Sequence, residues 1–450
     1  MSDKREQFSS KFGFLLAAVG SAVGLGNFWG FPTQAASNGG GAFVLAYLVL
    51  AFLLAYPALM AELVIGRYAR ANVVTALEGV GQTVFSRRLG KAVGIYGVLT
   101  ASLILSFYAI VSGWMIAHFG QPLAQVLSLH SVSHWLGQDG LLRNLLVAVF
   151  FMGLTIWIVA RGVQAGIEAW STRLMPLLLA ILLGLIIYVL LQPGAMAGLH
   201  TYLVPDFDQL TDPALLLSAM GQAFFSLSLG VGTLLIYGSY LSKKESLPRL
   251  GVAVTLLDVG IAFTAGLLII PAMYVAQHHG VMIYGDDGSL IAGPRLIFQV
   301  LPSLFGSMGV AGVGLSLAFF ALMTIAALTS SISMLEAPVS VIIERTRMQR
   351  SRAALVVGTA IFAISVLIVS NMNPLFDFIV SLTTKYSQPM LGLVLCVYAG
   401  WVMHRNQVLK ELQTGHLGVE HSLFWKVWPF YVRFICPALI LLTVGQSLRG

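Results

Sequence analysis

Long apolar segments separated by short polar segments run along almost the whole chain. A membrane-spanning helix needs roughly 20 apolar residues, and eleven segments have about that length or more: 12–36, 41–69, 89–120, 142–160, 166–191, 213–241, 248–277, 309–344, 352–370, 374–402 and 423–447. Several are long enough to cross a bilayer at a tilt. The pattern therefore predicts an all-α polytopic membrane protein, with one transmembrane domain over residues 1–450.

The composition agrees with this interpretation, since 58% of the residues are hydrophobic and only 10% are charged. The net charge of +7 comes mostly from basic residues in every second loop, and these loops would all lie on the same side of the membrane. The opposite loops carry Asp139, Asp206, Asp208, Asp212, Asp286 and Asp287. Because basic loops stay in the cytoplasm, we expect a cytoplasmic N-terminus, an external C-terminal Gly450 and a plasma membrane (bacterial inner membrane) location, with no nucleic-acid partner.

Two of the predicted spans contain sequences that interrupt a helix. The first holds the run Gly20-Ser21-Ala22-Val23-Gly24-Leu25-Gly26-Asn27, and the sixth holds Ser226-Leu227-Ser228-Leu229-Gly230-Val231-Gly232. A glycine costs about 1 kcal/mol in a helix interior, and unwound backbone in a membrane must find internal partners. Breaks at corresponding places predict two inverted five-span repeats, 12–191 and 213–402, plus an additional span at 423–447, with a binding site at the midplane. Close helix packing through small residues is the alternative for either break alone.

The first break, with Phe31-Pro32 and the run from Asn38 to Phe43, resembles the neurotransmitter:sodium symporter family, and most of all its bacterial LeuT-like amino-acid transporters. Further stretches resemble that family's motifs in order: Glu62 with residues 66–68, Tyr108, residues 221–230, Gly293-Pro294 and residues 328–331. The resemblance covers about the first ten spans. It implies a LeuT-like fold with spans 1 and 6 unwound at the midplane.

The resemblance also implies two sodium sites. One uses Ala22, Asn27, Ser226 and Asp258 together with a carboxylate of the substrate; the other uses Gly20, Val23, Ala326, Thr329 and Ser330. A hydroxyl that bonds back to its own helix is the alternative for Thr329 and Ser330. Asp258 lies alone in an apolar span, where a charge costs about 2.5 to 3.5 kcal/mol. Animal members of the family need chloride near this sodium, whereas chloride-independent members supply a fixed carboxylate, so we expect no chloride requirement. A carboxylate hydrogen-bonded between helices is the alternative for Asp258.

The substrate site implied by the resemblance is an amino-acid clamp. Free N–H groups of Leu25 and Gly26 would bind a carboxylate with help from the Tyr108 hydroxyl. The full set of expected substrate-binding residues is Ser21, Ala22, Leu25, Gly26, Ile104, Tyr108, Phe225, Ser226, Ser228, Val231, Ser330 and Met334. None of these side chains is charged, and a charged substrate side chain would lie there unpaired. A neutral and hydrophobic amino acid is therefore expected.

Gates are expected on both sides of this site. The inner gate would pair Arg5 with Glu344, beside Ser239 and Tyr240, and the outer gate would use Tyr108, Phe225 and Asp377. The family pattern has an arginine at the position of Gly30, so its absence leaves Asp377 without the expected partner. Glu62 is expected to accept hydrogen bonds from the sixth-span break, with proton relay as the alternative, and Glu336 and Lys385 have no role that the sequence reveals.

Together these features predict a sodium-coupled importer of amino acids that works by alternating access. Two alternatives remain open: a proton-coupled transporter in which Asp258 or Glu62 titrates, and a sensor that binds an amino acid without transporting it. An enzyme is not expected, because the sequence contains no catalytic constellation. The segment from Tyr284 to Phe305 is expected to form two short helical pieces that dip as a lid. The sequence leaves the oligomeric state open.

Overall fold

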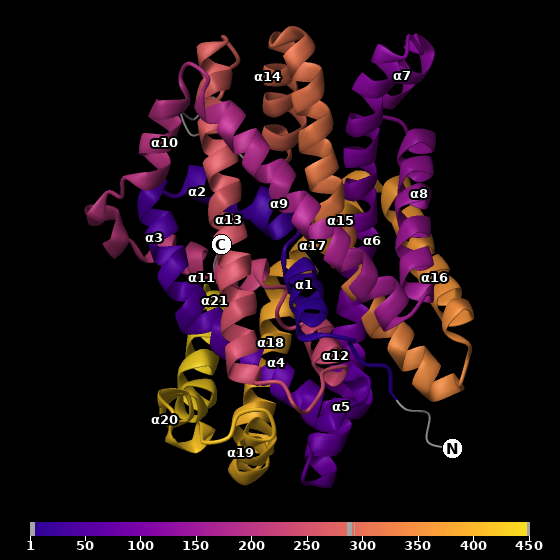
Figure 1. The fold of residues 1–450 in the computed structure, drawn as a ribbon, viewed down its shortest axis with the longest axis vertical. Coiled ribbons are helices and arrows are strands. Elements are labelled where there is room, and N and C mark those ends of the chain that lie inside the picture. The colour runs from indigo at the N-terminus through magenta and orange to yellow at the C-terminus, as the bar shows by residue number, and fades with distance from the viewer. Residues whose placement is uncertain (1–4, 286–289, 292, 448–450) are drawn as a thin grey trace.

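The computed structural model describes residues 5–285, 290–291 and 293–447, and its regular elements are helices (Figure 1). Eight helices are long and apolar enough to cross a membrane, or ten if each of two bent pairs counts as one span. The sixth predicted span appears as two shorter helices, so each of the eleven apolar segments has a helical counterpart. Asp286, Asp287 and Gly450, used above to assign the sides of the membrane, lie outside the described residues.

The bounds of the spans follow the predicted segments closely. In chain order they are α1 (Lys11–Ala22), η1 (Gly26–Gly30) and α2 (Phe31–Ser37); α3 (Gly41–Leu50), η2 (Ala51–Ala55) and α4 (Tyr56–Ala69); α6 (Val84–Val126); α8 (Leu141–Ala160); η3 (Val163–Glu168) and α9 (Ala169–Leu190); α11 (Pro213–Ser226) and α12 (Thr233–Ser239); α13 (Leu247–His278); α15 (Gly309–Thr346); α16 (Arg350–Ser370); α17 (Met372–Val380), η6 (Ser381–Ser387), α18 (Gln388–Val397) and η7 (Tyr398–Val402); and α20 (Leu423–Phe430), η9 (Tyr431–Ile435) and α21 (Cys436–Ser447).

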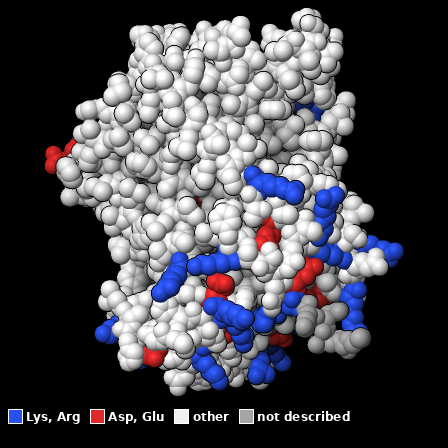
Figure 2. Space-filling model, viewed as in Figure 1, with Lys and Arg blue, Asp and Glu red and all other residues white. Residues whose placement is uncertain are grey.

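Short helices connect the spans: α5 (Val73–Val80), α7 (His130–Gly137), α10 (Ala195–Leu203), η4 (Phe207–Thr211), η5 (Leu296–Val300), α14 (Leu301–Ser307), α19 (Arg405–Gln413) and η8 (Val419–His421). In Figure 1, α5 and α19 lie at one end, named here the inner end, and α7, α10 and α14 lie at the other, the outer end. Figure 2, which has the same viewing direction, shows that Lys and Arg side chains gather in the half of the molecular surface nearer the inner end.

Both predicted breaks are present. In the first span, α1 ends at Ala22, Val23 is extended, and the axis bends by 51° before the helix continues from Gly26. In the sixth span, residues 227–232 separate α11 from α12. Positive φ angles occur there at Ser228, Gly230 and Gly232 (51°, 93° and 80°), a conformation that strongly favours glycine. The glycines of this segment therefore allow the backbone conformation that interrupts the helix.

Two predicted boundaries were wrong. The third span, α6, extends beyond residues 89–120 in both directions, and Thr83 caps its first turn by accepting a hydrogen bond from the Ser86 amide. The segment expected to form two pieces near Pro302 is instead continuous from η5 into α14. Pro302 lacks an N–H group for the preceding turn, and it lies directly after the π-helical turn of η5, where the helical hydrogen-bond pattern changes.

Candidate functional site

The end of α1 faces α15 through a cluster of oxygen atoms. The Ser330 hydroxyl lies 3.3 Å from the Gly20 carbonyl oxygen and 2.9 Å from that of Val23. On the same turn of α15, Thr329 Oγ1 lies 3.1 Å from the Ala326 carbonyl oxygen. All five residues of the predicted second sodium site are thus buried close together. Carbonyl and hydroxyl oxygens are the ligands that hard cations prefer, so the donor set fits sodium.

A second polar cluster surrounds Asp258, which is fully buried on α13 (0% exposed). Asn27 donates from Nδ2 to Asp258 Oδ1 at 2.8 Å, and Ser226 donates from its hydroxyl to Asp258 Oδ2 at 2.9 Å. No basic side chain pairs with Asp258 in the described part of the chain. The carboxylate is therefore held by two neutral donors, and it is the natural partner for a cation there.

Tyr47 is a member of this cluster that the sequence analysis missed. Its hydroxyl donates to Ser226 Oγ at 3.1 Å, and the side chain is fully buried on α3. A tyrosine in an apolar span needs a partner for its hydroxyl, which was the available signal, but nothing in the sequence identified Ser226 as that partner.

The Asn27 amide has a definite orientation. Its Oδ1 accepts from the Gly24 amide at 3.1 Å, while its nitrogen faces Asp258 and Ser226. An amide oxygen has two lone pairs, so Oδ1 can accept from the Gly24 amide and also bind a cation. The described contacts do not assign the Ala22 carbonyl to either polar cluster.

The predicted carboxylate clamp lies where η1 begins. The Leu25 amide donates to the Tyr108 hydroxyl at 3.1 Å, and Gln222 donates from Nε2 to the Gly26 carbonyl oxygen at 2.9 Å. A Cβ atom on Gly24 would lie 2.5 Å from Ser330 Oγ and 2.6 Å from the Tyr108 hydroxyl. Gly24 is thus required for this close approach, and the Leu25 N–H group points at the place where the clamp was expected.

The remaining predicted pocket residues come from three spans. Ile104 and Tyr108 share one face of α6, and Ser330 and Met334 share one face of α15, because residues four apart lie one above the other. From the sixth span come the half-buried Phe225, whose ring lies 3.3 Å from the Cβ position of Gly26, then Ser228, whose hydroxyl lies 3.4 Å from the Ser21 carbonyl oxygen, and the buried Val231. Ser21 itself donates to Ser333, a neighbour that the sequence analysis did not identify.

Glu62 performs the structural role expected of it. Its carboxylate accepts from the Gly230 amide at 2.6 Å and from the Leu235 amide at 3.2 Å. Both donors are backbone groups that the unwinding of the sixth span leaves without helical partners. The prediction that Glu62 accepts hydrogen bonds from this break is confirmed.

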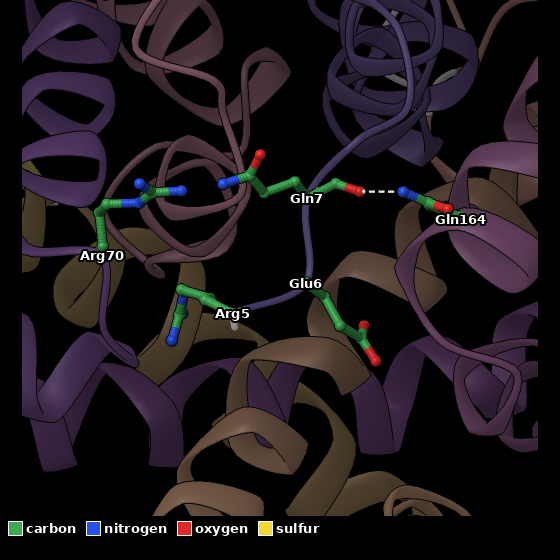
Figure 3. Close-up of a pocket in the computed structure, with 5 residues that line it drawn as sticks. All are labelled: Arg5, Glu6, Gln7, Arg70 and Gln164. Atoms are coloured by element: carbon green, nitrogen blue, oxygen red, sulfur yellow. Dashed lines mark hydrogen bonds between the residues drawn. The ribbon is translucent and has the colours of Figure 1, made fainter. Parts of the chain in front are cut away.

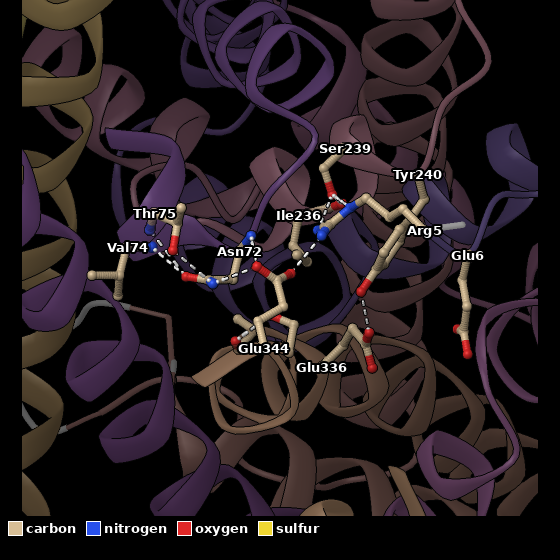
Figure 4. A network of polar contacts seen from close by, with 12 residues as sticks. Arg5, Glu6, Asn72, Val74, Thr75, Ile236, Ser239, Tyr240, Glu336 and Glu344 are labelled. Carbon is tan, nitrogen blue, oxygen red and sulfur yellow. Dashed lines mark hydrogen bonds and ion pairs between the residues drawn. The ribbon is translucent and has the colours of Figure 1, made fainter. Parts of the chain in front are cut away.

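The inner end carries a network of polar side chains (Figure 4). Arg5 forms an ion pair with Glu344, donates to the Ser239 hydroxyl at 2.7 Å and lies over the Tyr240 ring at 4.9 Å. Glu344 also accepts from the Asn72 amide at 3.1 Å. Arg5 therefore contacts each of the other three residues expected at the inner gate, and it joins the N-terminal segment to the sixth and eighth spans.

A second ion-pair group adjoins this one and includes Glu336. Arg350 pairs with Glu336 and, at 3.0 Å, with Glu6, while the Tyr240 hydroxyl donates to Glu336 at 2.5 Å. Glu6 and Arg350 were not predicted, because residues 344 positions apart give no local sequence signal. Beside this network lies a cavity of about 670 Å³, lined by Arg5, Glu6, Gln7, Arg70 and Gln164 (Figure 3).

The outer side differs from the inner side. Asp377 is exposed on α17 and forms no ion pair with another described residue. Gly30 faces Gln222, whose Oε1 lies 3.2 Å from the Cβ position of Gly30. Lys385 is likewise exposed, on η6, and the described contacts give it no ion pair.

Comparison with known proteins agrees with the geometry. The profile of the sodium:neurotransmitter symporter family matches residues 5–144 and 125–449. The uncharacterized sodium-dependent transporter YhdH of Bacillus subtilis is 32% identical over 98% of both chains. The sodium- and chloride-dependent taurine transporter of Homo sapiens is 28% identical over 66% of this chain and 54% of its own length. The crystal structure of MhsT in complex with L-phenylalanine is 34% identical, with a TM-score of 0.83 over 99% of this chain and 100% of that one.

These similarities confirm the predicted all-helical LeuT-like fold and identify a transporter rather than an enzyme. The matches cover nearly the whole chain, including both broken spans and the residues around them. The chain belongs to the sodium:neurotransmitter symporter family and is a sodium-dependent, multi-pass membrane transporter.

Proposed function

We propose that this transporter imports a neutral, hydrophobic amino acid together with sodium, by alternating access. One observation carries the proposal: within residues 20–27, the broken first span contributes to three different polar contacts. These are the Gly20 and Val23 carbonyls at Ser330, the bond from Leu25 to Tyr108, and the bond from Asn27 to Asp258. Two oxygen-rich clusters therefore flank the Leu25 N–H group, which is bonded to the Tyr108 hydroxyl, and this arrangement is suited to two cations and one carboxylate.

The expected side-chain pocket supports the choice of substrate. The residues assigned to it are apolar, aromatic or hydroxyl-bearing, so a charged substrate side chain would be desolvated without a partner, at a cost of several kcal/mol. MhsT, to which this chain is similar over nearly its full length, was crystallised with L-phenylalanine. Phenylalanine is therefore the first substrate to test.

Two sodium ions would drive the import. One is proposed at Gly20, Val23, Ala326, Thr329 and Ser330, and the other at Ala22, Asn27, Ser226 and Asp258 with the substrate carboxylate. Moving one charge across a membrane potential of 100 mV yields about 2.3 kcal/mol. Two sodium ions at this potential therefore supply about 4.6 kcal/mol, which supports roughly a thousandfold accumulation of the substrate. Since Asp258 supplies a fixed negative charge at the proposed sodium site that it shares with Ala22, Asn27 and Ser226, transport is proposed to proceed without chloride.

Alternating access requires contacts that exist in only one of two states. The network of Arg5, Ser239, Tyr240 and Glu344 is proposed as the inner gate, which breaks when the substrate is released to the cytoplasm. The basic side chains around it support a cytoplasmic inner end (Figure 2).

Uptake of radiolabelled L-phenylalanine into proteoliposomes tests this proposal. Uptake is measured with either sodium or choline in the external buffer, at fixed pH and fixed membrane potential. In a separate experiment, a proton gradient is applied across the vesicle membrane in choline buffer. Uptake driven by sodium alone supports the proposal, whereas uptake driven by protons in choline contradicts it. Counterflow with the same vesicles distinguishes a transporter from a protein that only binds the amino acid.

A further inference from the structure

The last span carries an arginine, Arg433 of η9, that is held against the end of the tenth span. Its Cζ atom lies 3.9 Å from the centroid of the Trp401 ring, and Trp401 Nε1 donates to the Arg433 carbonyl oxygen at 2.9 Å. A Cβ atom on Gly400 would lie 2.9 Å from Arg433 Cα, so the glycine allows this close approach of η7 to η9. Trp401 therefore fixes both the backbone and the guanidinium of Arg433.

The side chains around this contact are exposed. The Phe434 ring lies 5.3 Å from that of Trp401 and 5.1 Å from that of Phe430, and the three rings are 44%, 51% and 59% exposed. Arg433 is exposed as well, and so is Lys426, which precedes Phe430 by one turn. Lys426, Phe430, Arg433, Phe434 and Trp401 are named here the Trp401–Arg433 surface. Because it lies on two membrane spans, its exposed rings face lipid.

The two spans offer Arg433 no acidic partner. Residues 423–447 contain no Asp or Glu, and residues 374–402 contain only Asp377, at the opposite end of that span from Trp401. Among the described residues, Arg433 forms no ion pair. A cation facing lipid is costly, and contact with one ring offsets only part of that cost. An anion from outside the protein is needed to complete the contact.

The depth of Arg433 indicates where such an anion lies. The chain bends by 98° between residues 374–402 and α19, so the tenth span ends one residue after Trp401. In Figure 1, α19 and α20 lie next to each other toward the inner end. Tryptophan at the end of a span is typical of the membrane interface. Arg433 therefore lies where the headgroups of the inner leaflet begin, and Lys426, seven residues earlier, lies about 10 Å nearer the inner end.

We propose that the Trp401–Arg433 surface binds an anionic phospholipid of the inner leaflet, with the Arg433 guanidinium on the lipid phosphate. A guanidinium can donate two parallel hydrogen bonds to a phosphate, and the Trp401 ring contacts its face, which leaves its N–H edge open. Phe430 and Phe434 would contact the acyl chains. Lys426 adds a second positive charge, which attracts an anionic headgroup and repels the cationic group of a zwitterionic one.

Native mass spectrometry of the purified full-length protein in detergent tests this proposal. The protein is titrated with phosphatidylglycerol or with phosphatidylcholine of the same acyl chains. The wild-type protein should bind phosphatidylglycerol at least about fivefold more tightly, and Arg433→Gln should lose about this factor. Arg433→Lys keeps the charge and should bind more tightly than Arg433→Gln. The matched control is Arg345→Gln, which removes an exposed charge at the end of α15 and should leave the affinity unchanged.

Three results would overturn the proposal. The first is equal affinity of the wild-type protein for the two lipids, a comparison that needs no variant to fold. The second is an unchanged affinity in Arg433→Gln, or an equal loss in Arg345→Gln. The third is displacement of the bound lipid by excess glycerol phosphate, which would indicate a site for a free anion. The same spectra report dimers, and their loss in Arg433→Gln at unchanged lipid affinity would assign the surface to a second copy instead.

Discussion

Asn27 Nδ2 lies 2.8 Å from Asp258 Oδ1, which joins the broken first span to α13. The other oxygen of the same carboxylate accepts from Ser226, at the end of α11. One fully buried acidic group therefore holds both interrupted spans, and a cation bound beside it would replace neutral donors that now satisfy it.

The first prediction concerns Asp258→Asn. The substitution keeps the size of the side chain but removes the negative charge, so the sodium concentration for half-maximal uptake should rise at least about tenfold, equivalent to about 1.4 kcal/mol. The measurement is initial uptake of L-phenylalanine as a function of sodium. Asp377→Asn removes an exposed carboxylate instead and should leave this dependence unchanged, whereas equal effects of the two substitutions would refute the role of Asp258.

The second prediction concerns the break in the sixth span. A Cβ atom on Gly230 would lie 2.2 Å from the Gln388 carbonyl oxygen, and φ is 93°. Gly230→Ala should therefore destabilise the protein by more than about 2 kcal/mol, seen as a lower unfolding temperature in detergent. Gly221→Ala is the matched control, because its Cβ meets nothing within 4 Å on α11, and it should be neutral or stabilising by up to about 1 kcal/mol.

The sequence predicted the spans and their breaks because both depend on local physics. Apolar segments must be helical in a membrane, and closely spaced glycines weaken the helix where they occur. Glu62 was predictable although Gly230 lies 168 positions away, because it falls in a stretch that resembles the family's motifs and unwound backbone leaves donors for a carboxylate. The contacts of Tyr47 with Ser226 and of Glu6 with Arg350 were not predicted, because no motif marked these residues and they are 179 and 344 positions apart.

The third prediction distinguishes a structural Glu62 from a proton relay. Glu62→Ala leaves two buried backbone donors, on Gly230 and Leu235, without partners, at about 1 to 3 kcal/mol each. Glu62→Gln retains one acceptor oxygen and should cost less. The unfolding temperature should be highest for the wild-type protein, lower for Glu62→Gln and lowest for Glu62→Ala. Sodium-driven uptake should persist in Glu62→Gln. Loss of uptake in a stable Glu62→Gln protein would instead favour the relay.

The fourth prediction concerns the inner gate. The Phe8 amide donates to the Tyr240 carbonyl oxygen at 3.2 Å, beside the ion pair of Arg5 with Glu344. This partly buried pair is expected to contribute about 1 kcal/mol, so Arg5→Ala should speed hydrogen exchange at the Phe8 amide about fivefold. Arg70→Ala, at the edge of the same cavity, should have no such effect. An equal exchange rate of the Phe8 amide in the wild-type protein and in Arg5→Ala would show that the ion pair of Arg5 with Glu344 does not stabilise the closed inner gate.

The outer side could not be predicted from the sequence to the same extent. The resemblance places an arginine at the position of Gly30 in the family pattern. Hydrophobic periodicity cannot predict ring contacts among distant residues such as Trp29, Trp114 and Phe298. Aromatic residues in apolar spans are ordinary core residues by composition alone. Their common position became evident only when α6, η5 and α17 were placed together.

Accumulation of L-phenylalanine in proteoliposomes tests the central claim most directly. With sodium outside, at fixed pH and membrane potential, the internal concentration should rise well above the external one and should be unaffected when gluconate replaces chloride. With choline in place of sodium, no accumulation should occur. Accumulation in choline equal to that in sodium would contradict sodium-coupled amino-acid import.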